Sequence, residues 1–301
     1  MLRATFIALL MLPRTAAAHA GAHGPDDLLR TWTLEPWVIV FLALSALLYT
    51  LGWRRLRART RRSPARSRRP LHFFAGWLAL VAALVSPVDA LGELLFSGHM
   101  VQHLLLTMVV APLLVMSDAG MVMLWALRRN GRAVVGRLLR MRSVKQCWRS
   151  VSNPISAWSL AAGALVLWHI PSLYELAIVD ERVHALEHWT FLATALLFWW
   201  KVFSPRRRLA FGTSLVYLFT AATTSGILGA MISLSTEPWY TVHARWTPAW
   251  GLTTLEDQQL AGLIMWVPAA IIYVCAVVPI VLHTLTERSS PAPPAGTRVA
   301  I

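Results

Sequence analysis

The sequence predicts an all-α polytopic membrane protein, in which a bundle of seven transmembrane helices follows a cleavable signal peptide. Of its 301 residues, 56% are hydrophobic and only 14% are charged, and the mean hydropathy is +0.55. Seven apolar segments have about the 17–25 residues that a bilayer requires. The basic residues lie in short blocks between these segments. Because backbone groups in lipid must be paired internally, the segments are expected to be helices.

The N-terminus has the pattern of a secretory signal peptide. A basic Arg3 precedes the short apolar run Phe6–Leu12, and small residues follow at Ala16–Ala20. The best cleavage site follows Ala20, which makes residues 1–20 the signal peptide and residues 21–35 an extracytoplasmic N-terminal segment. An uncleaved N-terminal anchor is the alternative.

The transmembrane domain is predicted over residues 36–285, and residues 286–301 form a flexible cytoplasmic tail rich in Pro and Ala. The expected spans, in order, are Pro36–Trp53, Leu71–Val88, His99–Ser117, Pro154–Ile170, Val183–Phe203, Leu209–Leu234 and Leu260–Leu285.

The basic residues predict how the chain is oriented. Of the 28 Lys and Arg residues, 23 fall in the loops after the first, third and fifth spans and in the tail. The positive-inside rule places these loops and the C-terminus in the cytoplasm and the mature N-terminus outside. Cleavage of a signal peptide also requires that the mature N-terminus lies outside. We therefore expect a multi-pass membrane protein in contact with the lipid bilayer, with its N-terminus outside and its C-terminus in the cytoplasm.

Six of the ten histidines then fall on the outer side of the membrane: His99, His103, His169, His184, His188 and His243. His99 and His103 begin the third span, and His184 and His188 begin the fifth. Residues four apart share one face of a helix, with Cβ atoms about 5–6 Å apart, which suits two imidazoles that bind one metal ion. The pattern predicts a metal site of His99, His103, His169, His184 and His188.

Other polar residues are candidates for the rim of this site or the layer around its ligands. Glu187 can orient an imidazole, Met100, Met231 and Met265 offer thioether sulfur at outer helix ends, and His243 lies in an outer loop. Imidazole with optional thioether suits copper or zinc. Each histidine also has a simpler interpretation, as a hydrogen-bonded polar group at the membrane interface.

The leader suggests a second copper ligand set. Cleavage after Ala20 leaves Gly21, Ala22 and His23 at the mature N-terminus. An amine, two backbone nitrogens and the third-position imidazole provide the four nitrogens that Cu(II) prefers in a square plane. In the alternative interpretation His23 is only part of a mobile terminus.

Four sequence blocks resemble a known family: "HMVQHLLL", "WHIPSLYELA", "HALEHWTFLATALLFWW" and "EDQQLAGLIMWVP". Together they resemble the multi-spanning CtaG family of cytochrome c oxidase assembly factors, over about residues 30–285. The resemblance implies a multi-pass protein of the bacterial plasma (inner) membrane that is not an enzyme and that helps to deliver copper to a haem–copper oxidase. Oxidase subunits and extracytoplasmic copper chaperones are the implied partners. The last block adds Asp257 and Gln258 as candidate site residues.

Two other functions stay open at this point. In an intramembrane zinc hydrolase, three histidines would hold zinc while Glu187 or Asp257 activates water. In a bis-His haem protein that carries electrons, two histidines on opposing helices would bind the iron. Nucleic-acid binding is not expected, because no basic helix alternates with exposed aromatic residues.

Overall fold

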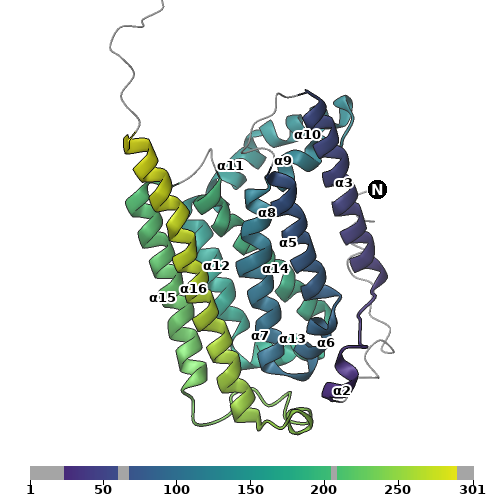
Figure 1. Ribbon diagram of the computed structural model, residues 1–301, viewed down its shortest axis with the longest axis vertical. Coiled ribbons are helices and arrows are strands. Elements are labelled where there is room, and N and C mark those ends of the chain that lie inside the picture. Colours follow the sequence, from purple (N-terminus) through teal and green to yellow (C-terminus); the bar gives the residue numbers. More distant parts are fainter. Residues whose placement is uncertain (1–23, 60–67, 205–208, 290–301) are drawn as a thin grey trace, which may run out of the picture.

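The computed structural model describes residues 24–59, 68–204 and 209–289, and within these ranges the chain forms helices and loops without β-strands (Figure 1). The predicted signal peptide, the candidate copper ligands Gly21–His23 and the last twelve residues of the tail, 290–301, lie outside the described residues.

Most of the described helices follow one another with short connections, except for the longer loop between α15 and η2. In chain order they are α2 (Pro25–Leu28), α3 (Pro36–Arg59), α5 (Arg69–Leu84), α6 (Pro87–Leu94), α7 (Phe96–Leu104), the π-helix η1 (Leu105–Val110), α8 (Ala111–Met116), α9 (Ala119–Leu124), α10 (Arg129–Arg140), α11 (Arg142–Val151), α12 (Pro154–Trp168), α13 (Pro171–Val179), α14 (Glu181–Phe203), α15 (Phe211–Ser233), the 3₁₀-helix η2 (Thr247–Trp250) and α16 (Thr254–Ser289).

Each of the seven expected segments falls on helix, and four to six of them qualify as membrane spans. Four helical stretches of the described chain are long and apolar enough to cross a bilayer, and two bent helix pairs raise the number to six if each pair is one span. The remaining segment lies on α14, which has 23 residues but does not qualify, because it carries three charged side chains and two histidines near its start and Lys201 near its end. The count of seven spans stays a prediction.

Both bends occur where a proline starts the second helix. The α5–α6 pair bends by 43° before Pro87, and the α11–α12 pair bends by 65° before Pro154. A residue before proline avoids the α conformation, so the helix ends there. The side chains of Ser86 and Asn153 then accept hydrogen bonds from Val88 and Ile155 and cap the new helices.

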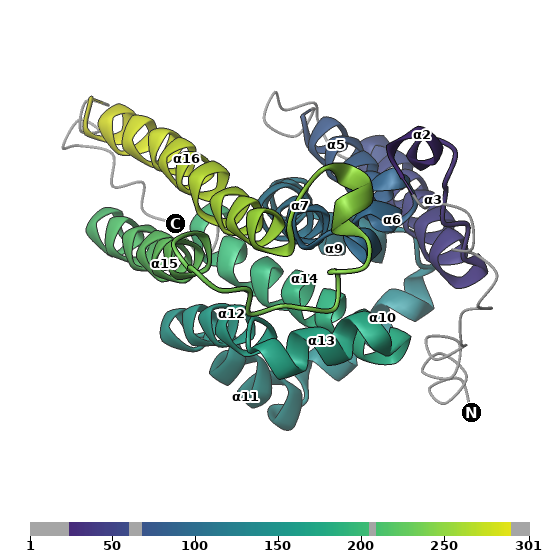
Figure 2. The same ribbon diagram turned by 90° about the horizontal axis from the view of Figure 1, so that it is seen from below.

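The helices are arranged so that α7 and α14 lie in the middle of the molecule, between the α15–α16 pair and the α3–α5–α6 group (Figure 2). The bundle has two chemically different ends. The Arg-rich helices α10 and α11 lie at one end, and α6, α13 and the loop that joins α15 to α16 lie at the other (Figure 1). The helix ends that carry the candidate histidines lie at this second end, opposite the basic helices.

Helices α15 and α16 approach closely through two glycines. A Cβ atom added to Gly262 would lie 2.6 Å from the carbonyl oxygen of Gly229 and 2.4 Å from Ser233 Oγ. Small residues allow such contacts, which hold helices together where the surrounding lipid is as apolar as the side chains. A Cβ atom added to Gly226 would have no other atom within 4 Å, so Gly226 makes no such contact.

The helix that follows His103 widens into the π-helix η1. Ala111 donates its N–H to Leu106 instead of to Thr107. In this register the carbonyl of Thr107 would pair with residue 112, but Pro112 has no N–H. The indole Nε1 of Trp199 on α14 donates to this carbonyl at 2.8 Å. A π-turn and a proline thus create a hydrogen bond between the two central helices.

Candidate metal centre

One face of α14 presents three polar side chains at the end of the bundle opposite the basic helices. His184, Glu187 and His188 are three or four positions apart, so they share a face. Asp180 caps the helix by accepting hydrogen bonds from the backbone N–H groups of Arg182 and Val183. The face is therefore fixed within the first two turns of a well-capped helix.

His99 and His103 on α7 meet this face. The ring centroid of His99 lies 5.3 Å from that of His184 and 5.9 Å from that of His188. Glu187 points between the two α7 histidines, with its oxygens 3.4 Å from His99 Nε2 and 3.5 Å from His103 Nε2. The structure thus brings together four of the five histidines that the sequence predicted as ligands.

Four of these residues each offer a ligand atom within 4.8 Å of the other three: His99, His184, Glu187 and His188, called here the His/Glu cluster. A tetrahedral ion with bonds of about 2.0–2.1 Å needs ligand atoms about 3.4 Å apart, so binding would contract the cluster by up to about 1.4 Å. Glu187, expected in the layer around the ligands, is itself a candidate ligand.

The polar atoms of the cluster show that its residues fit a metal ion. Glu187 and His99 are fully buried, and neither the oxygens of Glu187 nor the ring nitrogens of His99 and His103 make a hydrogen bond with any described residue. Buried polar groups are nearly always hydrogen-bonded, and buried charges are paired or coordinate metals. A cation bound among these atoms would satisfy them.

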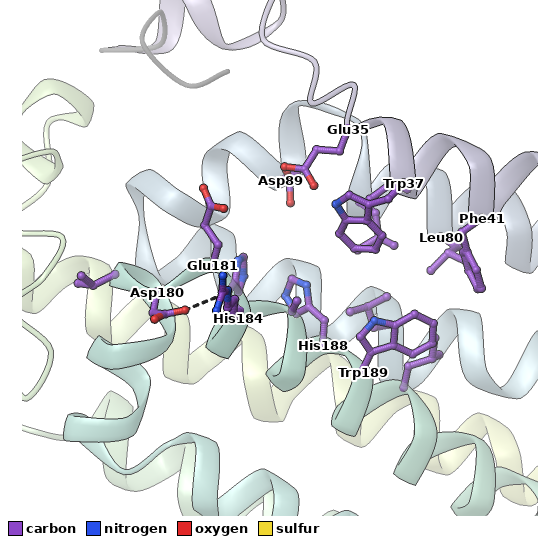
Figure 3. Close-up of a pocket in the computed structure, with 17 residues that line it drawn as sticks. Glu35, Trp37, Phe41, Leu80, Asp89, Asp180, Glu181, His184, His188 and Trp189 are labelled. Carbon is purple, nitrogen blue, oxygen red and sulfur yellow. Dashed lines mark hydrogen bonds between the residues drawn. The ribbon is translucent and has the colours of Figure 1, made fainter. Parts of the chain in front are cut away.

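A cavity of about 390 Å³ leads to the cluster between α3, α5, α6 and α14 (Figure 3). His184 and His188 point into it from α14. The wall also carries four carboxylates, from Glu35, Asp89, Asp180 and Glu181, and a single guanidinium, from Arg182. Trp37, Phe41 and Trp189 make the remaining wall apolar. The excess of negative charge favours the entry of a cation.

His169 does not join the cluster, although its sequence position suggested that it would. It follows the last residue of α12, and its ring centroid lies 6.5 Å from that of His103. Its Nδ1 bonds to the carbonyl of Leu165 at 2.7 Å, and its Nε2 lies 3.3 Å from Met100 Sδ. Its side chain therefore faces Met100.

His243, expected at the rim, is a buried residue of the loop between α15 and η2. It contacts the cluster only indirectly. Its Nε2 shares a 2.8 Å hydrogen bond with the hydroxyl of Tyr174, whose ring centroid lies 5.2 Å from that of His99. The pKa of His243 is lowered to about 3, mainly by burial and to a smaller extent by the nearby His99. His243 is therefore neutral at physiological pH and supports Tyr174.

Asp257 and Gln258 are also outside the cluster. Asp257 accepts hydrogen bonds from the backbone N–H groups of Phe96 and Ser97 at 2.7 and 3.1 Å. Gln258 accepts a bond from the backbone of Trp239 at 2.6 Å and donates to the carbonyl of Glu237 at 3.3 Å. Asp257 caps α7 and Gln258 holds the loop after α15, so both residues help to position the site.

Sequence reasoning missed three residues that support the centre. Gln102 is fully buried and donates to the carbonyl of Ala83 at 2.7 Å and to Asp89 at 2.8 Å, which ties α7 to the cavity wall. Tyr240 donates to the carbonyl of His169 at 2.7 Å. Gln102 had a signal in the sequence, since it lies between two histidines in an apolar segment, whereas Asp89 and Tyr240 had none.

The comparison with protein families agrees with this arrangement. A family described as cytochrome c oxidase caa3 assembly factor matches residues 47–287, which include every residue of the His/Glu cluster. The chain belongs to this family. The caa3 assembly factor match covers α5 to α15 completely and most of α3 and α16.

Two curated relatives of this chain come from Mycobacterium bovis and Mycobacterium tuberculosis, and both are described as uncharacterised proteins. Each is 25% identical to this chain over 249 residues, which cover 79% of the chain. The chain corresponds to only 37% of the length of each relative. No solved structure matches it.

Proposed function

We propose that this assembly factor holds a copper ion at the His/Glu cluster and thereby assists the metallation of a haem–copper oxidase. The observation that carries the proposal is Glu187, a fully buried carboxylate without a hydrogen bond to any described residue, which three imidazoles of the cluster surround. Imidazole and carboxylate are suitable ligands for copper and zinc. The family supports copper, because the oxidase that it serves contains it.

The proposal places the cluster on the outer side of the plasma membrane and the Arg-rich helices in the cytoplasm. Copper would then enter through the acidic cavity from outside, delivered by an extracytoplasmic chaperone, and leave towards an oxidase subunit. The chain's own residues concentrate the cation, remove its water and hold it, without a chemical reaction. We also propose the signal peptide and the N-terminal Gly21-Ala22-His23 copper ligands as parts of this arrangement.

A zinc hydrolase is the second candidate, and the cavity favours it. A pocket of about 390 Å³ beside His184 and His188 has room for a small substrate, and Glu181 in its wall is a candidate base. A haem protein fits less well. The ring centroids of His99 and the α14 histidines lie only 5.3–5.9 Å apart, and Glu187 lies between the two helices, where a porphyrin would have to fit.

The test is metal analysis with an optical spectrum of the protein purified in detergent. We expect about one copper ion at the cluster and no Soret band. Bound zinc with peptidase or esterase activity would support the hydrolase instead. Failure to bind either metal would overturn the proposal.

A matched pair of variants connects the metal to the cluster. Glu187→Gln keeps the shape of the side chain and removes its charge, and we expect it to weaken Cu(II) and Zn(II) binding by at least about tenfold. Glu237→Gln, in the exposed loop after α15, should bind as the wild type does. In cells that lack their own copy of the gene, only the first variant should lower oxidase activity. Equal binding by both variants would exclude Glu187 as a ligand.

A further inference from the structure

A second cavity lies on the far side of His103 from the His/Glu cluster. It has a volume of about 90 Å³, and its wall is mainly apolar. Four side chains in this wall can bind a soft metal: Met100, His103, His169 and Met265. All four are buried. None of the cluster residues His99, His184, Glu187 and His188 lines this cavity.

The contact between His169 and Met100 requires an explanation. The carbonyl of Leu165 can only accept a hydrogen bond, so His169 Nδ1, 2.7 Å away, carries the proton. In a neutral imidazole, Nε2 then carries a lone pair and no proton. It lies 3.3 Å from Met100 Sδ, which also offers lone pairs, so neither atom can donate a hydrogen bond to the other. A second proton on the ring would place an unpaired charge in an apolar wall, at a high cost.

A metal ion between the two atoms removes this conflict. Bonds of about 2.0 Å to nitrogen and 2.3 Å to sulfur span the 3.3 Å separation at an angle of about 100°, which leaves room for a third ligand. His103 is a candidate, because it lines the same cavity and neither of its ring nitrogens has a hydrogen bond to a described residue. Thioether and imidazole without carboxylate favour Cu(I) over Zn(II) and Cu(II).

We propose that Met100 and His169, with His103, form a second metal site that is selective for Cu(I). The biological role of this site rests on the proposed function. The site extends that function by assigning divalent ions and Cu(I) to two different places in the protein. The carboxylate-containing His/Glu cluster binds divalent ions, and the Met/His site binds the cuprous ion. His103 lies between them, with its ring centroid 4.2 Å from that of His99 and 6.5 Å from that of His169.

The test is an anaerobic titration of the detergent-purified protein with Cu(I), in competition with a chromophoric Cu(I) chelator. Met100→Leu conserves volume, and His169→Asn keeps a donor for the Leu165 carbonyl while it removes Nε2. We expect each change to weaken Cu(I) binding by at least about tenfold and to leave Zn(II) binding unchanged. The control is Met231→Leu, at a methionine on α15 that is 54% exposed and lines neither cavity. It should have no effect on either ion.

Two further measurements test the site without the Met100→Leu and His169→Asn variants. X-ray absorption of the Cu(I)-loaded wild type should show a sulfur neighbour at about 2.3 Å, and its absence would overturn the site. Cu(I) affinity should survive Glu187→Gln, whereas a matching loss would show one shared site and also overturn the proposal. If Glu187→Gln leaves Zn(II) and Cu(II) binding intact, the proposed metal site at the His/Glu cluster is wrong. The Cu(I) titration still tests the Met/His site independently.

Discussion

The carboxylate of Asp257, in the first turn of α16, accepts a 2.7 Å hydrogen bond from the backbone N–H of Phe96, the first residue of α7, 161 positions earlier in the chain. Its other oxygen accepts from Ser97. Negative charge at a helix N-terminus pairs with otherwise unsatisfied N–H groups and with the helix dipole. Asp257 therefore fixes the start of the helix that carries His99 and His103.

Loss of this cap should lower the stability of the protein. We expect Asp257→Ala to reduce the free energy of unfolding by about 1–2 kcal/mol, measured by thermal unfolding in detergent. Asp257→Asn, which keeps an acceptor oxygen, should have a smaller effect. Asp26→Ala at the exposed start of α2 is the control. An Asp257→Ala protein as stable as the wild type would show that the cap contributes nothing.

The glycine contact between α15 and α16 should tolerate no side chain. Gly262→Ala places a methyl group 2.6 Å from the carbonyl oxygen of Gly229, so we expect a loss of about 1–3 kcal/mol in unfolding experiments. Gly226→Ala, on the same helix pair but with no atom within 4 Å, should leave stability unchanged or raise it. Similar effects of the two changes would contradict the close approach.

The buried His243 predicts a dependence of stability on pH. Its pKa of about 3 in the folded protein lies below the value of about 6.5 in the unfolded chain, so the unfolded chain binds a proton that the folded chain does not. Stability from this group is complete above pH 6.5 and declines as the pH falls towards 3. Between pH 7 and 5 the loss is about 2 kcal/mol.

His243→Gln, which keeps a partner for the Tyr174 hydroxyl but does not titrate, should remove that part of the pH dependence. The measurement is the melting temperature of both proteins at several pH values. Because the other histidines are common to both, the difference between the two curves isolates His243. Parallel curves would mean that His243 takes up a proton in the folded state.

The proposed orientation predicts opposite signals from two reporter fusions. A fusion at residue 62, in the first basic loop, should report the cytoplasm, and a fusion at residue 245, in the loop after α15, should report the outside. The same signal from both positions would contradict the arrangement of the spans. Reversed signals would place the His/Glu cluster on the cytoplasmic side and exclude delivery of copper from outside.

Much of the fold follows from features that act locally in the sequence. The apolar segments locate the long helices within a few residues, and the 3.6-residue period explains why His184 and His188 share a face. The bends before Pro87 and Pro154 were not predicted, although proline restricts the residue before it. The division of the second expected span into α5 and α6 depends on this restriction together with the cap at Ser86.

The site could be predicted in part, because the spacing of residues on one helix does not determine which faces meet. The pairs His99/His103 and His184/His188 were recognised from their spacing. The central position of Glu187 depends on the rotation of α14 against α7, and the separation of His169 depends on where α12 ends. Asp257 resembles a site residue in the sequence, but it is used as a cap on another helix.

The hydrogen bond from Trp199 to the carbonyl of Thr107 in η1, which continues α7, holds α7 and α14 in register. An axial slide of either helix would break this bond and leave the indole N–H of Trp199 unpaired in a buried position, which is costly. The faces of the two helices that carry the proposed ligands therefore keep a constant height relative to each other. Under the proposed function, an ion would move from the His/Glu cluster towards Met100 by rotation of single side chains, above all the imidazole of His103, while the backbone stays in place.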